Sequence, residues 1–283
     1  MKDKKLFDEF IKEKIKNMKL NTKPRRINNL VMDGDKYVYI PTDLKPKTDV
    51  PTMFDTNYYF LWNQKRICNM MSYYGENFFK GKKILEMGCG WAYLGAYFDY
   101  LGAEVTVSDA REEHIKVVKE RYPQLTSLVV DSDSLEWEYP EEKYDIIIHF
   151  GLLYHLSDPA NSIKIVSERC DNLLLETEVL NSNDPTKIQY NKEEADWNKG
   201  GWGMAHNKLG STPSYAYVEE HLKKNGMKFI LAPNAEELNS IDVMATKGVE
   251  HPQQDYTWER KNTGEWRSGQ RQMWYCEKIK NGK

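Results

Sequence analysis

The sequence predicts an α/β protein in which a mostly parallel sheet is covered by helices on both faces. From residue 82 onward, short apolar runs alternate with amphipathic segments. The runs are nearly continuous and rich in β-branched residues, which is typical of parallel strands buried on both faces. The first run, "KKILEMG", ends in an acid and a glycine-containing turn. In open α/β sheets such a turn lies at the carboxyl ends of the strands, where ligands bind.

Strands and helices alternate in order along the chain. Helix ends are marked by Gly102 and Pro123, and Asp158 followed by Pro159 suits a helix start. The last segment alternates polar and apolar residues, so we expect it to add an antiparallel strand. The expected strands are 82–88, 103–110, 126–132, 144–155 (running into a turn), 172–179, 227–233 and 271–279, and the expected helices are 92–102, 111–123, 158–170 and 213–226.

Two kinds of addition surround this core. Residues 1–53 are expected to form an N-terminal helix, at 1–20, followed by an extended segment. The helix is amphipathic and needs an apolar partner surface, in its own chain or in a second copy that would make a homo-oligomer. The main domain is expected at 54–283, starting with a helical stretch and carrying polar insertions at 180–212 and 234–270.

Composition excludes several classes of function. The 283 residues carry a net charge of −3, which gives no global sign of binding to nucleic acid or to an anionic membrane. There is no apolar stretch near the 18 residues that a membrane span needs, and the first residues lack the apolar centre of a signal peptide. The four cysteines form no CxxC pair, so we expect no metal site and no disulfide framework. A soluble, cytoplasmic protein is the expectation.

The glycine turn "EMGCGWA" favours one nucleotide cofactor over another. The dinucleotide fingerprint GxGxxG would need a third glycine at position 93, which is Tyr93, so a nicotinamide-dependent oxidoreductase is disfavoured. An alternative pattern, an acid, then GxG, then a small residue, is satisfied by Glu86, Gly88, Gly90 and Ala92.

This alternative resembles motif I of the class I S-adenosylmethionine-dependent methyltransferases. The resemblance implies a Rossmann-like fold with a mostly parallel seven-stranded sheet and an antiparallel last strand, and S-adenosylmethionine as the cofactor, with S-adenosylhomocysteine as the product. Asp109 follows 19 residues after Gly90, at a strand end where a carboxylate can accept both ribose hydroxyls. "DIIIHFGLLYHLSDP" resembles motif IV of the same family. The implied cofactor-binding residues are Glu86 (amino group), Gly88, Cys89, Gly90, Asp109 (ribose), Ala110, Asp131 and Ser132 (adenine), Phe150 and Gly151.

A narrower resemblance concerns the acceptor. "FGLLYHLSDP", "LLLETEV" and "PSYAYVEEHLKKNGMKF" are similar to segments of the tRNA wobble-uridine (carboxy)methyltransferases and their relatives. In the carboxymethylating members a basic residue is expected after the Tyr-His pair, and here it is Leu156, which favours ordinary S-adenosylmethionine. The acidic chain has no obvious RNA-binding face, so a small-molecule acceptor is favoured over tRNA or another RNA.

Methyl transfer is an in-line displacement that mainly needs proximity and alignment, with a general base if the acceptor is a hydroxyl or a protonated nitrogen. His155 and Glu176 lie at adjacent strand ends where a base would stand, and His206 is a third candidate. Tyr154 is expected to flank the sulfonium or the acceptor. Structural roles for His155 and Tyr154 are equally open at this point.

Aromatic residues in the first insertion suggest how the acceptor is bound. Tyr190, Trp197 and Trp202 lie among glycines and charges, as in loops that form a lid or a pocket over a rigid scaffold. The alternative is that these rings only hold the loop against the protein. A non-catalytic protein that binds S-adenosylmethionine is the remaining rival from another class.

Overall fold

The computed structural model describes residues 30–33, 36–39, 63, 66, 67, 69–71, 73–134, 136–193, 205–232 and 271–279. The predicted helix at 1–20, the insertion at 234–270, and Trp197 and Trp202 lie outside these described residues. In the described part, no helix is both long enough and apolar enough to span a bilayer.

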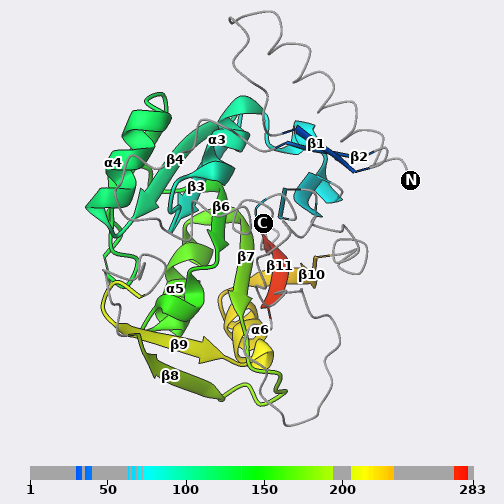
Figure 1. Cartoon of the computed structure of the whole chain (residues 1–283). Helices are drawn as coiled ribbons and strands as arrows, with labels where there is room; N and C mark the ends of the chain where they lie inside the picture. The colour runs from blue at the N-terminus through cyan, green and yellow to red at the C-terminus, as the bar shows by residue number, and fades with distance from the viewer. Residues whose placement is uncertain are drawn as a thin grey trace, which may run out of the picture.

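A seven-stranded sheet forms the centre of the described fold (Figure 1). Its strand order is β10-β11-β7-β6-β3-β4-β5, and β11 runs antiparallel to both of its neighbours while the remaining pairs are parallel. The predicted mostly parallel sheet with an antiparallel last strand is therefore confirmed. The strands are β3 (Lys83–Met87), β4 (Glu104–Asp109), β5 (Thr126–Val129), β6 (Tyr144–Phe150), β7 (Cys170–Glu178), β10 (Met227–Leu231) and β11 (Arg271–Lys278).

Helices cover both faces of this sheet, as the apolar strands predicted. Helices α3 (Tyr93–Tyr100) and α4 (Glu112–Arg121) bury their apolar sides on one face, together with helical residues between 63 and 74. Helices α5 (Pro159–Glu168) and α6 (Tyr215–Lys224) bury theirs on the other face. Successive strand residues alternate between the two cores: Ile84 belongs to the first and Leu85 to the second.

Local sequence signals fix several helix ends. The Asp158 carboxylate accepts a hydrogen bond from the Asn161 amide at 3.0 Å, and Pro159 occupies the first helical position of α5. The Ser214 hydroxyl caps α6 in the same way, accepting from the Tyr217 amide at 3.0 Å. These caps fix where α5 begins after η3 and where α6 begins directly after β9.

Part of the first insertion is an antiparallel hairpin, formed by β8 (Ile188–Lys192) and β9 (Leu209–Pro213). A polar insertion was predicted here, and the two strands were not expected because they lack an apolar alternation. The hairpin is held against the 3-10 helix η3 (Leu153–His155) that follows β6, where the Ser211 hydroxyl donates to the Leu156 carbonyl at 2.7 Å. A second, smaller pair joins β1 (Leu30–Asp33) to β2 (Lys36–Tyr39), where an extended segment was predicted.

Candidate functional site

The glycine turn after β3 adopts a backbone that needs its glycines. Gly88 and Gly90 have φ values of 63° and 53°, in the left-handed region that side chains rarely adopt. A Cβ atom at Gly88 would also lie 2.9 Å from Leu152 Cδ1. The turn therefore passes directly beside the segment that follows β6, which brings the predicted motif I and motif IV regions together.

Glu86, the acid before this turn, is buried beneath it. Its Oε2 atom accepts a hydrogen bond from the Gly95 amide of α3 at 2.7 Å. A Cβ atom at Gly95 would lie 2.8 Å from the same oxygen, so the close approach of α3 to β3 requires a glycine there as well. Burial, partly offset by this hydrogen bond and by the charge of Arg66, raises the pKa of Glu86 to about 8.

Asp109, at the end of β4, is held as an ionised carboxylate. It accepts hydrogen bonds from the amides of Gly90 and Arg111, each at 3.0 Å, and His114 Nδ1 lies 3.0 Å from its Oδ1 atom. Burial opposes the charge, but these contacts with His114 and the two amides hold the pKa of Asp109 below its usual range. An ionised carboxylate here accepts hydrogen bonds and donates none.

Cys89, inside the turn, is a packing residue in this geometry. Its side chain is 2% exposed, and its amide donates to the Ser108 carbonyl at 2.8 Å. Burial, together with the charges of Asp109 and Glu86, raises the pKa of the thiol well above its usual value. The neutral thiol is a poor nucleophile, so only its backbone contributes to the site.

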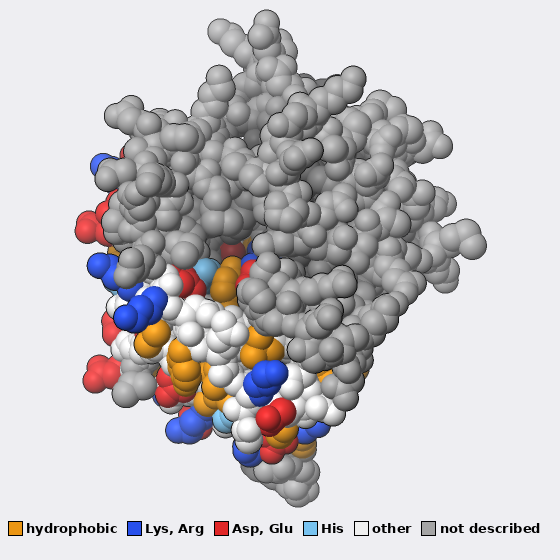
Figure 2. All heavy atoms as spheres, turned by 60° about the horizontal axis from the view of Figure 1, so that its bottom comes forward, with side chains coloured by type: hydrophobic (Ala, Val, Ile, Leu, Met, Phe, Trp, Pro, Cys, Tyr) orange, Lys and Arg blue, Asp and Glu red, His pale blue; other side chains and the backbone are white. Residues whose placement is uncertain are grey.

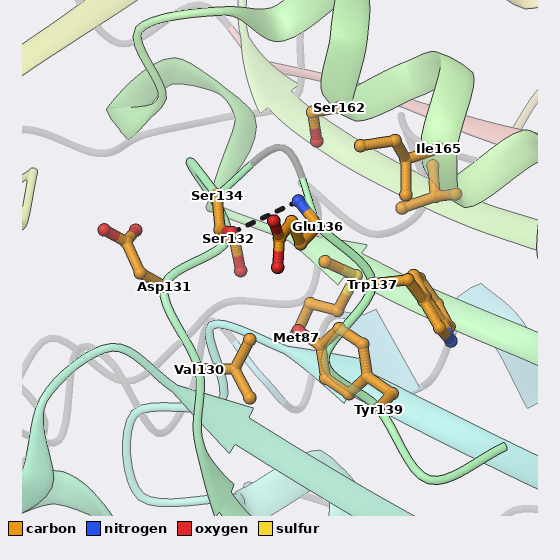
Figure 3. Close-up of a pocket in the computed structure, with 11 residues that line it drawn as sticks. Met87, Val130, Asp131, Ser132, Ser134, Glu136, Trp137, Tyr139, Ser162 and Ile165 are labelled. Atoms are coloured by element: carbon orange, nitrogen blue, oxygen red, sulfur yellow. Dashed lines mark hydrogen bonds between the residues drawn. The ribbon is translucent and has the colours of Figure 1, made fainter.

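Asp131 follows β5, next to a small pocket (Figure 3). Its Oδ1 atom accepts from the Asp133 amide at 3.0 Å, and its Oδ2 atom accepts from the Asn207 side chain at 3.1 Å. The pocket holds about 280 Å³ of empty space, part of it open to solvent, and Ser132 lines it. In Figure 3 the Asp131 carboxylate points away from the aromatic side of this pocket, which is formed by Trp137 and Tyr139.

A buried cation lies at the end of β6, where Phe150 and Gly151 were predicted to border the cofactor. The Arg66 guanidinium carbon is 5.4 Å from the centre of the Phe150 ring, and a Cβ atom at Gly151 would lie 3.0 Å from Arg66 Nη2. Arg66 also forms an ion pair with Glu176, at the end of the neighbouring strand β7. Both side chains of this pair are buried.

Glu176 is held between two arginines. Arg271 Nη1, from the start of β11, lies 3.0 Å from Glu176 Oε1, opposite Arg66. Burial alone would raise the pKa of Glu176, but the charges of Arg66 and Arg271 keep it below its usual range. A carboxylate stabilised in this way is a weak proton acceptor, so the geometry favours a positioning role for Glu176 over its predicted role as a base. Arg271 Nη2 also donates to the Tyr154 hydroxyl at 2.7 Å, which fixes that ring.

His155 has a carboxylate partner from the hairpin. Its Nδ1 atom is 2.8 Å from Glu193 Oε2, directly after β8, and the same oxygen accepts from the Ala205 amide. The exposed fractions of the His155 and Glu193 side chains are 16% and 10%. Among the described residues, His155 Nε2 has no hydrogen-bond partner. This pairing of an imidazole with an acid is the arrangement that orients a histidine for proton transfer.

The other predicted residues differ in how exposed they are. His206 is exposed, Ala110 is half-buried, and the Tyr190 side chain is 57% exposed on β8. The predictions for Trp197 and Trp202 lie outside the described residues. In the part of the chain that the structure describes, no group of three His, Cys, Asp or Glu side chains is arranged to hold a metal ion.

A protein-family model described as a methyltransferase domain matches residues 59–232. The chain belongs to this methyltransferase family. The family confirms the predicted class of enzyme and, at the level of the family, S-adenosylmethionine as the donor. The matched residues include the helical stretch before β3 and extend through the glycine turn, both halves of the hairpin and β10.

Individual relatives are more distant. Protein N-lysine methyltransferase METTL21A of Danio rerio is 28% identical over 148 residues, which is 47% of this chain and 62% of that protein. Ubiquinone biosynthesis O-methyltransferase of Bordetella pertussis is 31% identical over 88 residues, covering 30% of this chain and 36% of that enzyme. The matches thus span less than two thirds of these relatives. They give no support to the narrower resemblance to tRNA wobble-uridine enzymes, which stays a prediction.

Solved structures establish the same fold for the methyltransferase domain. The N-terminal domain of EvdMO1, crystallised with SAH and D-fucose, has a TM-score of 0.51 at 16% identity and covers 78% of this chain and 83% of that one. Magnesium protoporphyrin IX methyltransferase (ChlM) from Synechocystis PCC 6803 has a TM-score of 0.50 at 12% identity, with 83% and 86% covered. At these identities the likeness concerns the fold alone.

The residues at the carboxyl edge of the sheet fit an S-adenosylmethionine molecule by their chemistry. Gly88 and Gly90 carry no side chain, so a ligand beside this turn can approach the backbone closely. Glu86 and Asp131 can accept hydrogen bonds from amino groups, and ionised Asp109 can accept from ribose hydroxyls. Arg66 supplies a buried positive charge near Glu86, as a donor carboxylate would need.

The partners that shape this site were not among the predicted residues. Each of these partners is a charged or titratable side chain that contacts a predicted residue from another part of the chain. They are Arg66, His114, Glu193 and Arg271. His114 carried a weak signal, because it lies in the first turns of the helix that follows Asp109. Glu193 carried none: it is one acid among several in a polar insertion.

Proposed function

We propose that this methyltransferase transfers the methyl group of S-adenosylmethionine to a hydroxyl oxygen of a small molecule. The observation that carries the proposal is the arrangement at one edge of the sheet. The carboxyls of Glu86, Asp109 and Asp131 lie at or just after the carboxyl ends of the neighbouring strands β3, β4 and β5. The His155–Glu193 pair lies at the turn after β6. A cofactor held by the acids would have an imidazole beside it.

The cofactor supplies an electrophilic methyl group on a sulfonium. In our proposal Glu86 binds its ammonium group, Arg66 its carboxylate, Asp109 its ribose and Asp131 with Ser132 its adenine. Gly88, Gly90 and Gly151 let the backbone come close. These residues supply position and alignment, which is the main requirement for in-line methyl transfer.

A hydroxyl acceptor also needs a place for its proton. We assign that role to His155, since a neutral imidazole is a suitable base near neutral pH. Tyr154 adjoins it, with ring centres 3.9 Å apart, and is held by Arg271, so it limits the directions from which an acceptor reaches the imidazole. Glu176 holds the two arginines instead of accepting a proton.

Two observations support a small acceptor. Several relatives carry the name ubiquinone biosynthesis O-methyltransferase, which refers to methylation of an oxygen on a small molecule. In addition, Figure 2 shows acidic and basic side chains interspersed over the described part of the face that carries β8 and β9, without a continuous basic area there. RNA binding depends on such an area, because phosphates supply most of the attraction.

A nitrogen acceptor is the second candidate. The similarity to a protein N-lysine methyltransferase favours it, and a protonated amine also requires a base before it can attack. His155 would take the proton in that case too. The two candidates differ in the product and are separated by an acceptor panel.

The proposal is tested by calorimetry and by a radiolabelled methyl-transfer assay. The full chain should bind S-adenosylhomocysteine but not NAD, and Asp109→Asn should weaken that binding by about 10- to 100-fold, the value of hydrogen bonds to a charged group. Asp99→Asn serves as the matched control, because it also neutralises a carboxylate, one that accepts a hydrogen bond from the exposed side chain of Gln124 at 3.1 Å. Catechol, other phenols, primary amines, a lysine-containing protein mixture and total tRNA form the panel. Binding of NAD alone, or transfer to tRNA alone, would refute the proposal.

A further inference from the structure

We propose that Glu193 is a positioning residue that fixes His155 with Nδ1 protonated, so that Nε2 is the atom that receives the acceptor's proton. The inference rests on the proposed function and adds a residue from the hairpin to the catalytic centre. It starts from the 2.8 Å contact between His155 Nδ1 and Glu193 Oε2, across 38 residues of sequence.

The ionisation of Glu193 decides which tautomer is present. Burial would favour the neutral acid, but the hydrogen bond and charge of His155, the Ala205 amide and the charge of Arg111 keep the pKa of Glu193 below its usual range. An ionised carboxylate can only accept hydrogen bonds, so His155 Nδ1 must be the donor. In the neutral ring, Nε2 then carries the lone pair.

The hairpin holds Glu193 rigidly in this position. Its amide donates to the Lys208 carbonyl at 2.8 Å, and its carboxylate accepts from the Ala205 amide. A Cβ atom at Gly210 would lie 2.2 Å from Glu193 Oε1 and 2.6 Å from the Tyr154 carbonyl oxygen. Glycine at 210 therefore allows the carboxylate to lie between β9 and η3.

The same segment reaches the residues assigned to the cofactor. Arg111, whose amide donates to Asp109, interacts through its charge with both Asp109 and Glu193. Asn207, just before β9, donates to Asp131 at 3.1 Å. Asn207, between β8 and β9, therefore contacts the residue assigned to adenine, and Glu193 interacts through its charge with Arg111, which follows the residue assigned to the ribose by two positions. Because Glu193 also orients the base, a functional role is favoured over a merely structural one.

Methyl transfer to the acceptor oxygen is a single displacement. The acceptor oxygen forms a bond to the methyl carbon while the bond from that carbon to sulfur breaks, and the bonding electron pair stays on sulfur. The hydroxyl proton passes to His155 Nε2, giving an imidazolium that the Glu193 carboxylate stabilises. The proton leaves to solvent before the next turnover. Glu193 stays an ionised carboxylate throughout and neither gains nor loses a proton.

The tautomer is measured directly by NMR of the full chain with ¹⁵N-labelled histidine, which needs neither cofactor nor acceptor. At a pH where the ring is neutral, His155 should show a protonated Nδ1 and an unprotonated Nε2. Glu193→Gln should abolish that preference. Asn191→Ala is the matched control, since it removes a hairpin contact to Thr212 at 3.0 Å without touching His155. An unchanged His155 spectrum in Glu193→Gln would overturn the inference.

Kinetics with catechol, or with whichever panel compound is methylated, test the coupling. General bases contribute about 10²- to 10⁴-fold, so Glu193→Gln should lower kcat by about tenfold or more while the Kd for S-adenosylhomocysteine stays the same. The double variant His155→Ala/Glu193→Gln should be no slower than His155→Ala alone, because Glu193 acts only through His155. Additive losses would contradict this role.

The two proposals fail in different ways. Absence of methyl transfer to every panel compound overturns the proposed function, although the NMR result still stands. Methyl transfer together with an unchanged tautomer, or with additive losses, overturns the role of Glu193 and leaves the proposed function intact.

Discussion

Glu86 illustrates how burial sets the chemistry of a single side chain. Its pKa of about 8 means that the Glu86 side chain is largely neutral at pH 7 when no ligand is bound. Motif I, in contrast, is expected to place an ionised carboxylate against an ammonium group. The folded-state pKa is raised from 4.5, so the fold loses stability as the pH rises from about 4.5 through 8, because the unfolded chain ionises first. A positively charged group bound beside Glu86 would favour the ionised carboxylate and so lower its pKa.

This leads to a prediction about proton linkage. Binding of S-adenosylhomocysteine should release a proton from Glu86 at pH 7, and its affinity should increase as the pH rises from 6 towards 8. Calorimetry in two buffers with different ionisation enthalpies measures the proton count. Glu86→Gln should remove the release, whereas Glu104→Gln, an exposed acid at the start of β4, should not. Equal proton release in wild type and Glu86→Gln would contradict the assignment.

At the scale of elements, β6 and α5 are joined by a buried histidine that the site does not use. His149 Nε2 lies 3.1 Å from the Ser162 hydroxyl, and burial lowers the pKa of His149 to about 4. The ring is therefore neutral in the fold over the whole physiological range. Below pH 6.5 the unfolded chain binds a proton that the folded chain rejects, so the fold loses stability as the pH falls from 6.5 to about 4.

His149→Gln should remove this dependence, since the amide does not titrate. In the wild type, His149 should lower the free energy of unfolding by at most about 3 kcal/mol between pH 6.5 and 4, since one pKa unit corresponds to about 1.4 kcal/mol. Urea unfolding at a series of pH values measures it, with exposed His206→Gln as the control for the loss of a histidine. The idea is wrong if His149→Gln and wild type lose stability in parallel over this range.

At the scale of the whole molecule, one ion cluster joins three distant parts of the chain. Arg66 comes from before the sheet, Glu176 from its middle and Arg271 from its last strand. Both arginines contact the central acid, and Arg271 Nη2 also lies 3.3 Å from Glu178 Oε1, so these buried charges are paired between distant parts of the chain. The cluster also places the described end of the chain, β11, next to the assigned cofactor site.

Glu176→Ala should destabilise the fold by about 3–5 kcal/mol, because it leaves two buried guanidinium groups without their shared acid. Glu142→Ala breaks the pair with Arg169 at the surface, where Glu142 is 89% exposed, and should cost no more than about 1 kcal/mol. Denaturant unfolding compares the two. Equal effects would mean that the buried cluster contributes no more than an ordinary surface pair.

Elements with a strong local pattern were predictable. Strand and helix positions followed from apolar periodicity, caps and breakers, and the strands from β3 to β7, β10 and β11 lie where they were expected. Glu86, Asp109 and Asp131 were predicted from the resemblance to motif I and from their places at or just after strand ends, and the carboxyl ends of these parallel strands meet at one edge. The hairpin was missed because its strands are mostly polar and lie outside the main sheet.

The sequence by itself therefore determined the fold class, the glycine turn and the row of acids, because each depends on neighbours within a few residues or on a general rule of sheet geometry. Only the tertiary structure decided the state of each group. Glu176 is matched by Arg271 across 95 residues, and His155 by Glu193 across 38. Whether a carboxylate is a base or one half of an ion pair depends on which charges share its buried surroundings, and those charges come from distant parts of the chain.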